Sequence, residues 1–279
     1  MALLTLREIL DMDKGIPAFD VFDSTMAEAV LQVALELNAP VILMTYEGHM
    51  KLFDINTVKT FVYMIKAKAD NLPIPIVLHL DHGKDVEFIR ECIYAGFSSV
   101  MFDGSNLPFE ENIKITKHLT ETARSHFVSI EAEVGRVGSD TGKVETIYTS
   151  PEDAVHFVKE TGVDALAISV GTTHGVYLKK PKIKANLVKD IKKALEENNL
   201  NAKLVLHGGS GTPPEELIKL IRNGIRKVNI GTDLNKAYLG AFSGSNTIYP
   251  EQVVPKAIKA LKEIVKKYIN IIYYQKEVE

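Results

Sequence analysis

The sequence has one cysteine, no long apolar run and no excess of charge of one sign. Because Cys92 is the only cysteine, it cannot form an internal disulfide, which is typical of proteins in a reducing compartment. No apolar run approaches the roughly 20 residues that a membrane helix needs, so we expect no bilayer-spanning segment. The first residues, Met1 to Thr5, lack the charged and apolar regions of a signal peptide, and we therefore expect a cytoplasmic protein.

The charges of the chain are balanced. The formal net charge is -3, and acidic and basic residues are interleaved without the basic patch that binds nucleic acid. We therefore expect no nucleic-acid partner and no membrane partner. With 46% hydrophobic residues among 279, the chain can bury one large core, which predicts a single domain over residues 1–279.

Short apolar runs with the length of buried strands recur along the chain, with helix-like segments between them. The eight predicted strands are residues 16–21, 40–45, 75–80, 98–102, 127–133, 164–170, 203–206 and 224–230. The intervening segments repeat apolar residues at intervals of three and four, as in Met26, Val30 and Val33, which predicts amphipathic helices. Strict alternation of strand and helix over this length is typical of a (β/α)8 TIM barrel, an α/β fold. A doubly wound open sheet follows the same pattern and is the alternative.

Two further segments follow the last predicted strand. Residues 234–242 form an apolar segment, and residues 253–272 have the pattern of a long amphipathic helix. We predict that they add an extra C-terminal helical segment to the barrel and do not form a second domain. The apolar face of the final helix favours a homo-oligomer, either a dimer or a tetramer.

Unusual polar residues collect directly after the predicted strands, where a barrel places its active site. Histidines follow the third, sixth and seventh strands, at His82, His174 and His207. Three imidazoles with an open position form the usual ligand set of a catalytic zinc ion, so we predict a divalent-metal site on this rim. The alternative is a set of hydrogen-bonded rim histidines without a metal.

Neighbouring residues support this interpretation. Asp81 adjoins His82 and is placed to hold or protonate a group on the metal, although an aspartate at a strand end is often a helix cap. His79 shares a strand face with Asp81, which indicates a supporting role. His49 lies near the rim without a partner in its motif. The remaining histidines, predicted to be surface residues, are His118, His126 and His156.

Two glycine-containing loops are candidates for a phosphate site. Residues 208–211, Gly-Gly-Ser-Gly, precede a helix that starts with proline, and residues 229–232, Asn-Ile-Gly-Thr, precede another helix. Backbone amides at such helix starts bind phosphate, and barrels often have this site after their seventh and eighth strands. Tight turns are the alternative for each run.

Together and in this order, the motifs resemble those of class II, metal-dependent ketose-bisphosphate aldolases, the family that includes fructose- and tagatose-bisphosphate aldolases. The likeness extends from about Leu3 to Ile272, and its most specific elements are residues 78–83, 100–105, 171–177 and 206–211. The resemblance implies a lyase that reversibly cleaves a ketose phosphate to dihydroxyacetone phosphate and an aldehyde. Fructose 1,6-bisphosphate and tagatose 1,6-bisphosphate are the first candidate substrates.

The resemblance also implies a role for each motif. His82, His174 and His207 are expected to bind one catalytic Zn²⁺, and Asp81 is expected to exchange a proton with the aldehyde-derived oxygen. Asp103 and Glu133 match acidic positions of a second or displaced metal location. The resemblance therefore implies that a second monovalent or divalent cation can bind there. The expected pocket for dihydroxyacetone phosphate comprises Gly175, Gly208, Gly209, Ser210, Asn229, Ile230, Gly231 and Thr232. Lysine Schiff-base chemistry belongs to a different aldolase class, and no lysine stands within these motifs.

Two features depart from the family pattern. The segment after the fifth strand, residues 134–145, is shortened, so the proton-abstracting base is unassigned, with Asp140 and Glu145 as candidates. Asp20 and Asp23 stand where the family usually has asparagines, and two carboxylates near the aldehyde end would repel a second phosphate. A ketose 1-phosphate with an unphosphorylated aldehyde half is therefore an alternative substrate.

Two other functions stay open at this point. Another metal-dependent barrel enzyme, such as a sugar-phosphate epimerase or isomerase, would use related enediolate chemistry. A binding or regulatory protein on an aldolase scaffold would keep the metal without the base, because a fold alone does not determine function.

Overall fold

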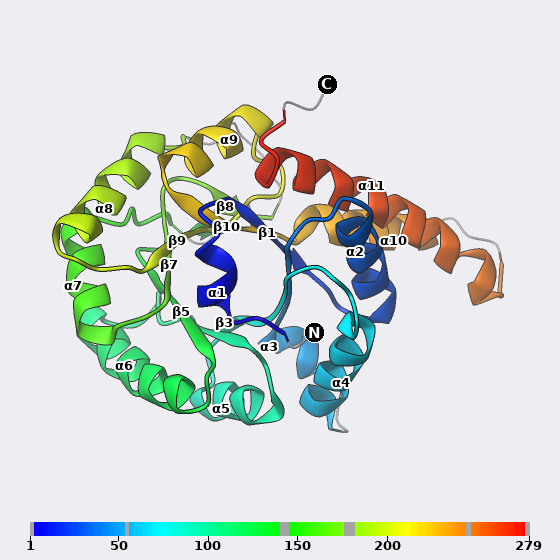
Figure 1. Ribbon diagram of the computed structural model, residues 1–279, viewed down its shortest axis with the longest axis horizontal. Coiled ribbons are helices and arrows are strands. Elements are labelled where there is room, and N and C mark those ends of the chain that lie inside the picture. The colour runs from blue at the N-terminus through cyan, green and yellow to red at the C-terminus, as the bar shows by residue number, and fades with distance from the viewer. Residues whose placement is uncertain (1–2, 54–55, 140–144, 176–181, 244–246, 277–279) are drawn as a thin grey trace.

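Eight parallel strands close into a barrel at the centre of the protein (Figure 1). The computed structural model describes residues 3–53, 56–139, 145–175, 182–243 and 247–276. The barrel strands are β1 (Ile16–Asp20), β2 (Val41–Tyr46), β3 (Ile76–Gly83), β4 (Ser99–Phe102), β5 (Ser129–Val134), β7 (Ala165–Ile168), β9 (Lys203–Leu206) and β10 (Ile225–Ile230). Each strand pairs with the next in this order, and β10 pairs with β1. The predicted (β/α)8 fold is confirmed, and the open sheet is wrong.

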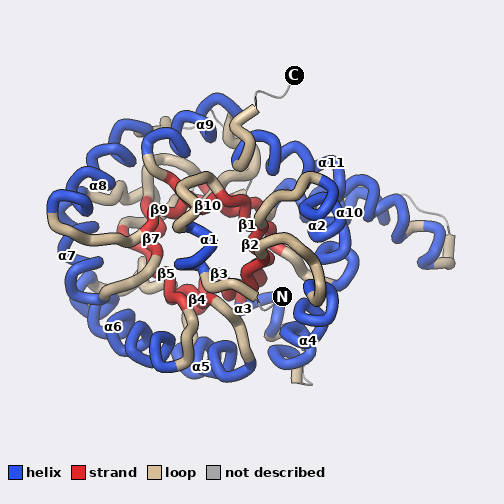
Figure 2. Tube along the Cα trace, in the orientation of Figure 1, coloured by secondary structure: helices blue, strands red, loops and turns tan. Residues whose placement is uncertain are grey.

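Helices surround the barrel and alternate with its strands (Figure 2). Those that follow a strand and cover the sheet are α2 (Ser24–Glu36), α4 (Thr57–Ala69), α5 (Val86–Ala95), α6 (Phe109–Ser125), α7 (Pro151–Thr161), α8 (Ala185–Glu197) and α9 (Pro214–Asn223). In α2 the predicted apolar stripe is buried, including Met26, Val30 and Val33. Ser150 caps α7 by accepting a hydrogen bond from the Asp153 amide.

The strands differ from the prediction mainly at their ends. β3 extends beyond residue 80 through His82, which has a φ of 47°. β5 starts at Ser129 and not at residue 127, because Phe127 has a φ of 57° and its side chain is 88% exposed. The pairing of β5 with β4 begins at Ser129, opposite Ser99, so Phe127 lies before the strand.

A short N-terminal helix, α1 (Leu6–Leu10), closes the amino end of the barrel and was not predicted. Thr5 and Glu8 form a capping box at its start. The Leu4 amide donates to the Ile76 carbonyl at 2.8 Å, and the Arg7 amide donates to Ser129 Oγ at 3.0 Å. These contacts hold α1 against the first residues of β3 and β5. Its buried side chains are Leu6, Ile9 and Leu10.

The C-terminal segment consists of α10 (Thr232–Phe242), a short turn of 3-10 helix at Pro250–Gln252, and α11 (Val254–Ile272). The predicted extra helical segment is therefore confirmed. α11 packs on α2 and α10, and Figure 1 shows α10 and α11 extending beyond the ring of helices. In the described part of the chain, no helix combines the length and the apolar character needed to cross a membrane.

Three small elements lie near the carboxyl ends of the barrel strands. α3 (Glu47–Met50) follows β2, and β6 (Gly138–Ser139) pairs in parallel with β8 (Thr173–His174). This two-stranded sheet links the segment after β5 to the segment after β7. It therefore places the backbone of His174 on the same side of the barrel as the ends of the other strands.

Candidate active site

A cavity of about 440 Å³ opens at the carboxyl ends of the barrel strands. The predicted site residues on its wall are Asp81, His82, Asp103, Glu133, Gly175, Gly208, Ser210, Asn229, Gly231 and Thr232. Residues far apart in the sequence meet here because the strand ends converge in a closed barrel. Gly209 and Ile230 do not line the cavity. Gly209 packs against Val228 and Asn229, and Ile230 is fully buried in the hydrophobic core.

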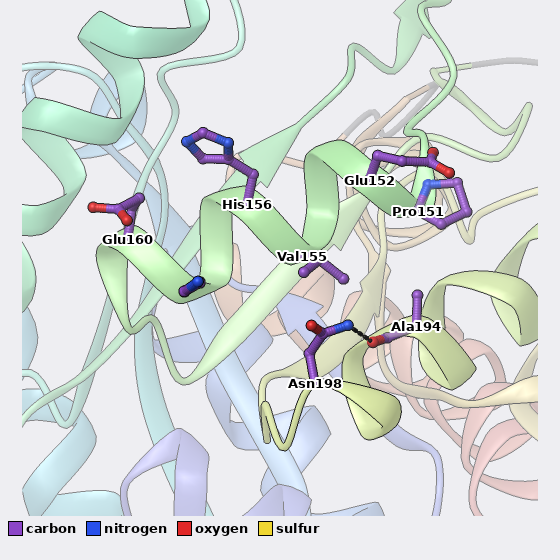
Figure 3. Close-up of a pocket in the computed structure, with 8 residues that line it drawn as sticks. Pro151, Glu152, Val155, His156, Glu160, Ala194 and Asn198 are labelled. Carbon is purple, nitrogen blue, oxygen red and sulfur yellow. Dashed lines mark hydrogen bonds between the residues drawn. The ribbon is translucent and has the colours of Figure 1, made fainter.

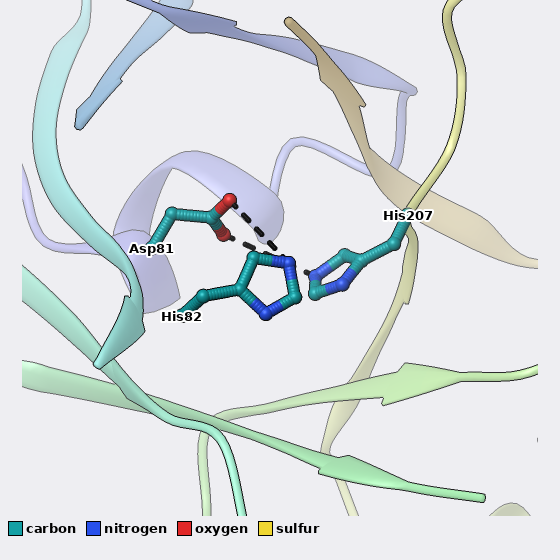
Figure 4. A group of neighbouring side chains, drawn as sticks. All are labelled: Asp81, His82 and His207. Atoms are coloured by element: carbon teal, nitrogen blue, oxygen red, sulfur yellow. Dashed lines mark ion pairs between the residues drawn. The ribbon is translucent and has the colours of Figure 1, made fainter. Parts of the chain in front are cut away.

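Asp81 and His82, on the cavity wall, meet His207, which is completely buried and does not itself line the cavity (Figure 4). The distance from Asp81 Oδ2 to His82 Nε2 is 3.8 Å, and that from Asp81 Oδ1 to His207 Nε2 is 4.0 Å. The two imidazole rings cross edge to face with centroids 4.6 Å apart. One donor atom from each of the three side chains lies within 4.8 Å of the others, which is close enough to share a metal ion.

Asp103 and Glu133 extend this group on the cavity side. His82 Nδ1 lies 3.0 Å from Asp103 Oδ2, and His207 Nδ1 lies 3.3 Å from Glu133 Oε2. His82, Asp103 and Glu133 form a second set of donor atoms within 4.8 Å of one another. The two acidic residues predicted for a second or displaced cation therefore lie beside the two histidines and not at a separate location.

His82 has a backbone conformation that turns it toward this group. Its φ of 47° is uncommon for a residue other than glycine. Its amide contacts Met101 Sδ at 3.4 Å, which replaces a regular pairing of β3 with β4 at this point. Strained backbone of this kind is concentrated at functional sites.

The predicted ligand His174 is placed only in part. Its backbone belongs to β8, but its side chain lies outside the described residues. The chain just before it is held against the His207 segment, because Thr172 Oγ1 donates to the His207 carbonyl at 2.7 Å. A Cβ atom on Gly208 would lie 2.4 Å from the Thr173 carbonyl oxygen, and Gly208 has a φ of 72°, so only glycine permits this approach. The role of His174 as a ligand stays a prediction.

The titration behaviour of the group favours positive charge at its centre. Burial acts to lower the pKa of His207, but its hydrogen bonds to Glu131 and Glu133 outweigh burial and raise that pKa to about 10. Burial likewise opposes a raised pKa at His82, where the charge of Asp81 prevails. Burial acts to raise the pKa of Asp81, yet His82 and the other nearby cations hold it well below its ordinary value. The carboxylates thus keep protons on both imidazoles, and a metal ion would replace those protons.

The side chains present fit a divalent cation. Four carboxylates surround the two imidazoles: Asp81, Asp103, Glu131 and Glu133. Within the described ranges, Lys227 is the one lysine or arginine that forms an ion pair with any of them. Imidazole nitrogens and carboxylate oxygens bind zinc, and also cobalt, iron and nickel. A divalent cation would therefore meet suitable donors and offset the excess of negative charge.

A buried layer beneath this group was largely missed by sequence reasoning. Glu131 and Lys227 are both completely buried, and Glu131 Oε2 lies 2.9 Å from Lys227 Nζ. His79, predicted as a support, lies in the same layer, with its Nε2 atom 3.6 Å from Glu131 Oε2 and 3.8 Å from Asp81 Oδ1. The available signal was the alternation along the strands, because Glu131 precedes Glu133 by two residues and Lys227 precedes Asn229 by two.

The predicted phosphate corner lies on one side of the cavity. Gly208 and Ser210 follow β9, and Gly231 and Thr232 form the start of α10. The amides at a helix start point outward and attract anions. Asn229 has a second function, since its Nδ2 atom donates to Asp81 Oδ1 at 2.9 Å.

Asp20 and Asp23 are in different environments. Asp23 caps α2 by accepting from the amides of Thr25 and Met26, it also accepts from the Tyr238 hydroxyl, and it does not line the cavity. Asp20 does line the cavity, beside Gly231. Burial and the charge of Asp81 raise the pKa of Asp20 to about 7. Of the two carboxylates that were expected to repel a second phosphate, only Asp20 therefore lies on the cavity wall.

Among the described residues, neither candidate base after β5 is found on the cavity wall, and two basic residues that were not predicted lie there instead. Asp140 lies outside the described residues, and Glu145 is exposed and does not line the cavity. Arg136, just before the undescribed part of the loop, does line it and donates to the Ser105 carbonyl at 3.2 Å. Lys84 also lies on the wall, one residue beyond the motif that ends at Gly83, and sequence reasoning missed it.

A second hollow, of about 510 Å³, lies between α7 and α8 (Figure 3). Its polar groups serve helix contacts: Asn198 donates to the Ala194 carbonyl at 2.9 Å, and Glu160 pairs with Lys117 at 3.5 Å. His156, on α7, lies on its wall. Because this hollow is remote from the strand ends, we assign the chemistry to the barrel cavity.

Comparison with known proteins agrees with this geometry. The family described as "Fructose-bisphosphate aldolase class-II" matches residues 5–276. The structure of the YdjI aldolase from Escherichia coli K12 is similar, with 28% identity, a TM-score of 0.83, and 97% of each chain covered. A protein assigned as a fructose-1,6-bisphosphate aldolase from Coccidioides immitis has 26% identity and a TM-score of 0.85, with 95% of this chain and 93% of that chain covered.

Proposed function

Since the chain belongs to the class II fructose-bisphosphate aldolase family and is an aldolase by family and fold, we propose that it is a zinc-dependent enzyme acting on a ketose phosphate. The reaction is reversible cleavage to dihydroxyacetone phosphate and an aldehyde. The observation that supports this most is the convergence of Asp81, His82 and His207 at one cavity, where Asp81 and His82 lie on the wall together with a helix start. One side binds a cation and the other an anion, as a ketose phosphate on a metal requires.

In this proposal His82, His174 and His207 hold the zinc ion, and Asp103 and Glu133 offer a second or displaced cation location. Bound zinc supplies Lewis acidity, which stabilises the negative charge left beside the carbonyl group when the carbon–carbon bond breaks. The chain's own residues transfer the proton of the aldehyde-derived oxygen and bind the phosphate.

Asp81 moves the proton of the aldehyde-derived oxygen. Its carboxylate faces the cavity between both histidines, and the Asn229 amide holds one of its oxygens at 2.9 Å. In the cleavage direction Asp81 accepts the hydroxyl proton as the bond breaks, and in condensation it returns that proton. The phosphate of dihydroxyacetone phosphate binds at Gly208, Ser210, Gly231 and Thr232, which directs the reacting carbons toward Asp81.

Fructose 1,6-bisphosphate and tagatose 1,6-bisphosphate are the first candidate substrates. A ketose 1-phosphate with an unphosphorylated aldehyde half is the second, and Asp20 favours it. A carboxyl group with a pKa of about 7 on the wall disfavours a second phosphate but can hydrogen-bond a hydroxyl group.

We also propose a homo-oligomer, supported by the exposed apolar residues Leu239, Phe242 and Ile248 of the C-terminal segment.

The test is the release of dihydroxyacetone phosphate, measured with a coupled reductase, from both bisphosphates and from ketose 1-phosphates. Each assay is repeated after treatment with a chelator and after adding zinc back. We expect release that is lost with the chelator and restored by zinc. No release from any of these substrates would reject the proposal and favour a catalytically impaired protein on this scaffold.

A further inference from the structure

A buried ion pair lies directly below the proposed zinc ligands. Lys227 on β10 and Glu131 on β5 each have no exposed surface, and Lys227 Nζ lies 2.9 Å from Glu131 Oε2. Neither residue lines the cavity. Lys227 therefore cannot reach a substrate carbonyl, and its function has to act through its neighbours.

Glu131 connects this lysine to His207. While Oε2 faces Lys227, Oε1 lies 3.1 Å from His207 Nε2. A carboxylate can only accept a hydrogen bond, so Nε2 has to carry the hydrogen. Nδ1, which lies 3.3 Å from Glu133 Oε2, is then the ring nitrogen that remains for a metal ion.

Glu131 keeps this orientation as long as its charge is compensated. Glu131 has no exposed surface, and within the described ranges Lys227 is the one lysine or arginine that forms an ion pair with it. Asp81, 3.8 Å from Lys227 Nζ, adds a second carboxylate to the same layer.

Resting on the zinc site proposed above, we propose that Lys227 is a positioning residue that, through Glu131, determines which ring nitrogen of His207 faces the metal. This proposal has an unusual electrostatic consequence. A lysine close to a metal site repels the metal, so its removal alone should strengthen metal binding. If Lys227 acts through Glu131, its removal weakens metal binding.

The experiment uses cobalt(II) as the probe and metal-free full-length protein. Cobalt is titrated by its visible absorption and by competition with a chelator, and circular dichroism with thermal unfolding verifies the fold. The variants are Lys227→Met, Glu131→Gln and the double variant. Arg226→Met is the matched control, since Arg226 is the adjacent residue on β10 and pairs with Asp13.

We expect Lys227→Met to weaken cobalt binding by about 10- to 100-fold, the range known for residues that support metal ligands, with altered visible bands. Arg226→Met should stay within about twofold of the wild type, as expected for a distant ion pair. In the Glu131→Gln background, Lys227→Met should no longer weaken binding, because the group through which it acts is gone.

Cobalt binding by folded Lys227→Met that is as tight as in the wild type, or tighter, would overturn the proposal. If Lys227→Met does not fold, cobalt binding by Glu131→Gln is compared with cobalt binding by the double variant. Weaker cobalt binding by the double variant would overturn the proposal. Wild-type protein that binds no cobalt, or whose binding survives His207→Ala, would instead reject the zinc site of the proposed function.

Discussion

The interior of the barrel is apolar at one end and ionisable at the other. The buried apolar cluster comprises Leu6, Ile9, Leu10, Ile16, Ala18, Ile42, Val77, Ala165, Ala167 and Val205 toward the amino end, and it reaches Met44 and Met101 next to the cavity. The buried residues near the carboxyl end include His79, Asp81, Glu131, Glu133, His207 and Lys227. The change occurs within single strands, since Val77, His79 and Asp81 follow one another on the same face of β3. β3 thus contributes packing at one end and chemistry at the other.

This difference implies that the two ends respond differently to substitution. At the amino end a truncated side chain leaves a cavity, which reduces the free energy of unfolding. At the carboxyl end a substitution removes a donor atom or a compensating charge, which reduces activity. The predictions below test how completely these two effects separate.

The largest expected effect is that of His207→Ala at the carboxyl end. Losing a metal ligand forfeits several kcal/mol of charge stabilisation, so kcat/KM should fall by at least about a thousandfold. Steady-state kinetics together with elemental analysis for zinc measures both losses. His156→Ala on α7 is the control and should keep its activity and its zinc. A zinc-free His207→Ala protein with wild-type activity would contradict the assignment.

Asp81→Asn should reduce kcat on the order of 10²- to 10³-fold, because the amide cannot exchange the proton of the aldehyde-derived oxygen. The zinc content should be unchanged, since the histidines supply the ligands. Kinetics on protein of measured metal content tests this separation. If zinc is lost in proportion to activity, Asp81 holds the metal and does not transfer the proton.

At the amino end, Leu6→Ala should lower the free energy of unfolding by about 3 kcal/mol, because Leu6 is completely buried between α1 and the barrel. The kcat/KM of the folded variant should equal that of the wild type. Urea denaturation measures the first quantity, and Leu52→Ala, at a leucine that is 68% exposed, is the control. A large fall in kcat/KM with intact stability would show that the two ends are coupled.

The smallest effect concerns Asp20, where burial and Asp81 raise the pKa from 3.8 to about 7. Between these values the folded protein binds more protons than the unfolded chain, so this group makes stability fall as the pH rises. Asp20→Asn removes that loss and should raise the free energy of unfolding above pH 7, with little change at pH 4. Denaturation at several pH values tests it, and a pH-independent difference would contradict it.

Much of the site at the carboxyl end of the barrel could be predicted because its residues follow strands in short motifs. Asp81, His82 and Asp103 lie directly at strand ends in the sequence, and a barrel brings such ends together. The buried pair of Glu131 and Lys227 could not be predicted in the same way. A lysine two residues before Asn229 has the same sequence pattern whether it is exposed or buried, and only the closed barrel places it opposite Glu131.

The structure at the amino end of the barrel was harder to predict. α1 has five residues, too few to show a helical period, and only its packing against β3 and β5 gives it a function. Asp23 illustrates the opposite case, because its position in the motif indicated a carboxylate in the cavity while the α2 backbone uses it as a cap. Helix caps and ligand-facing carboxylates are the same residue type and differ only in orientation.

The sequence by itself determined the alternation of strand and helix, the strand ends that hold the histidines, and the family, because these depend on local periodicity and on motifs a few residues long. Only the tertiary structure decided which carboxylates share the histidines, which lysine compensates them, and that Asp20 and not Asp23 faces the cavity. Those choices depend on distances between strands that are far apart in the chain, and they arise when the barrel closes.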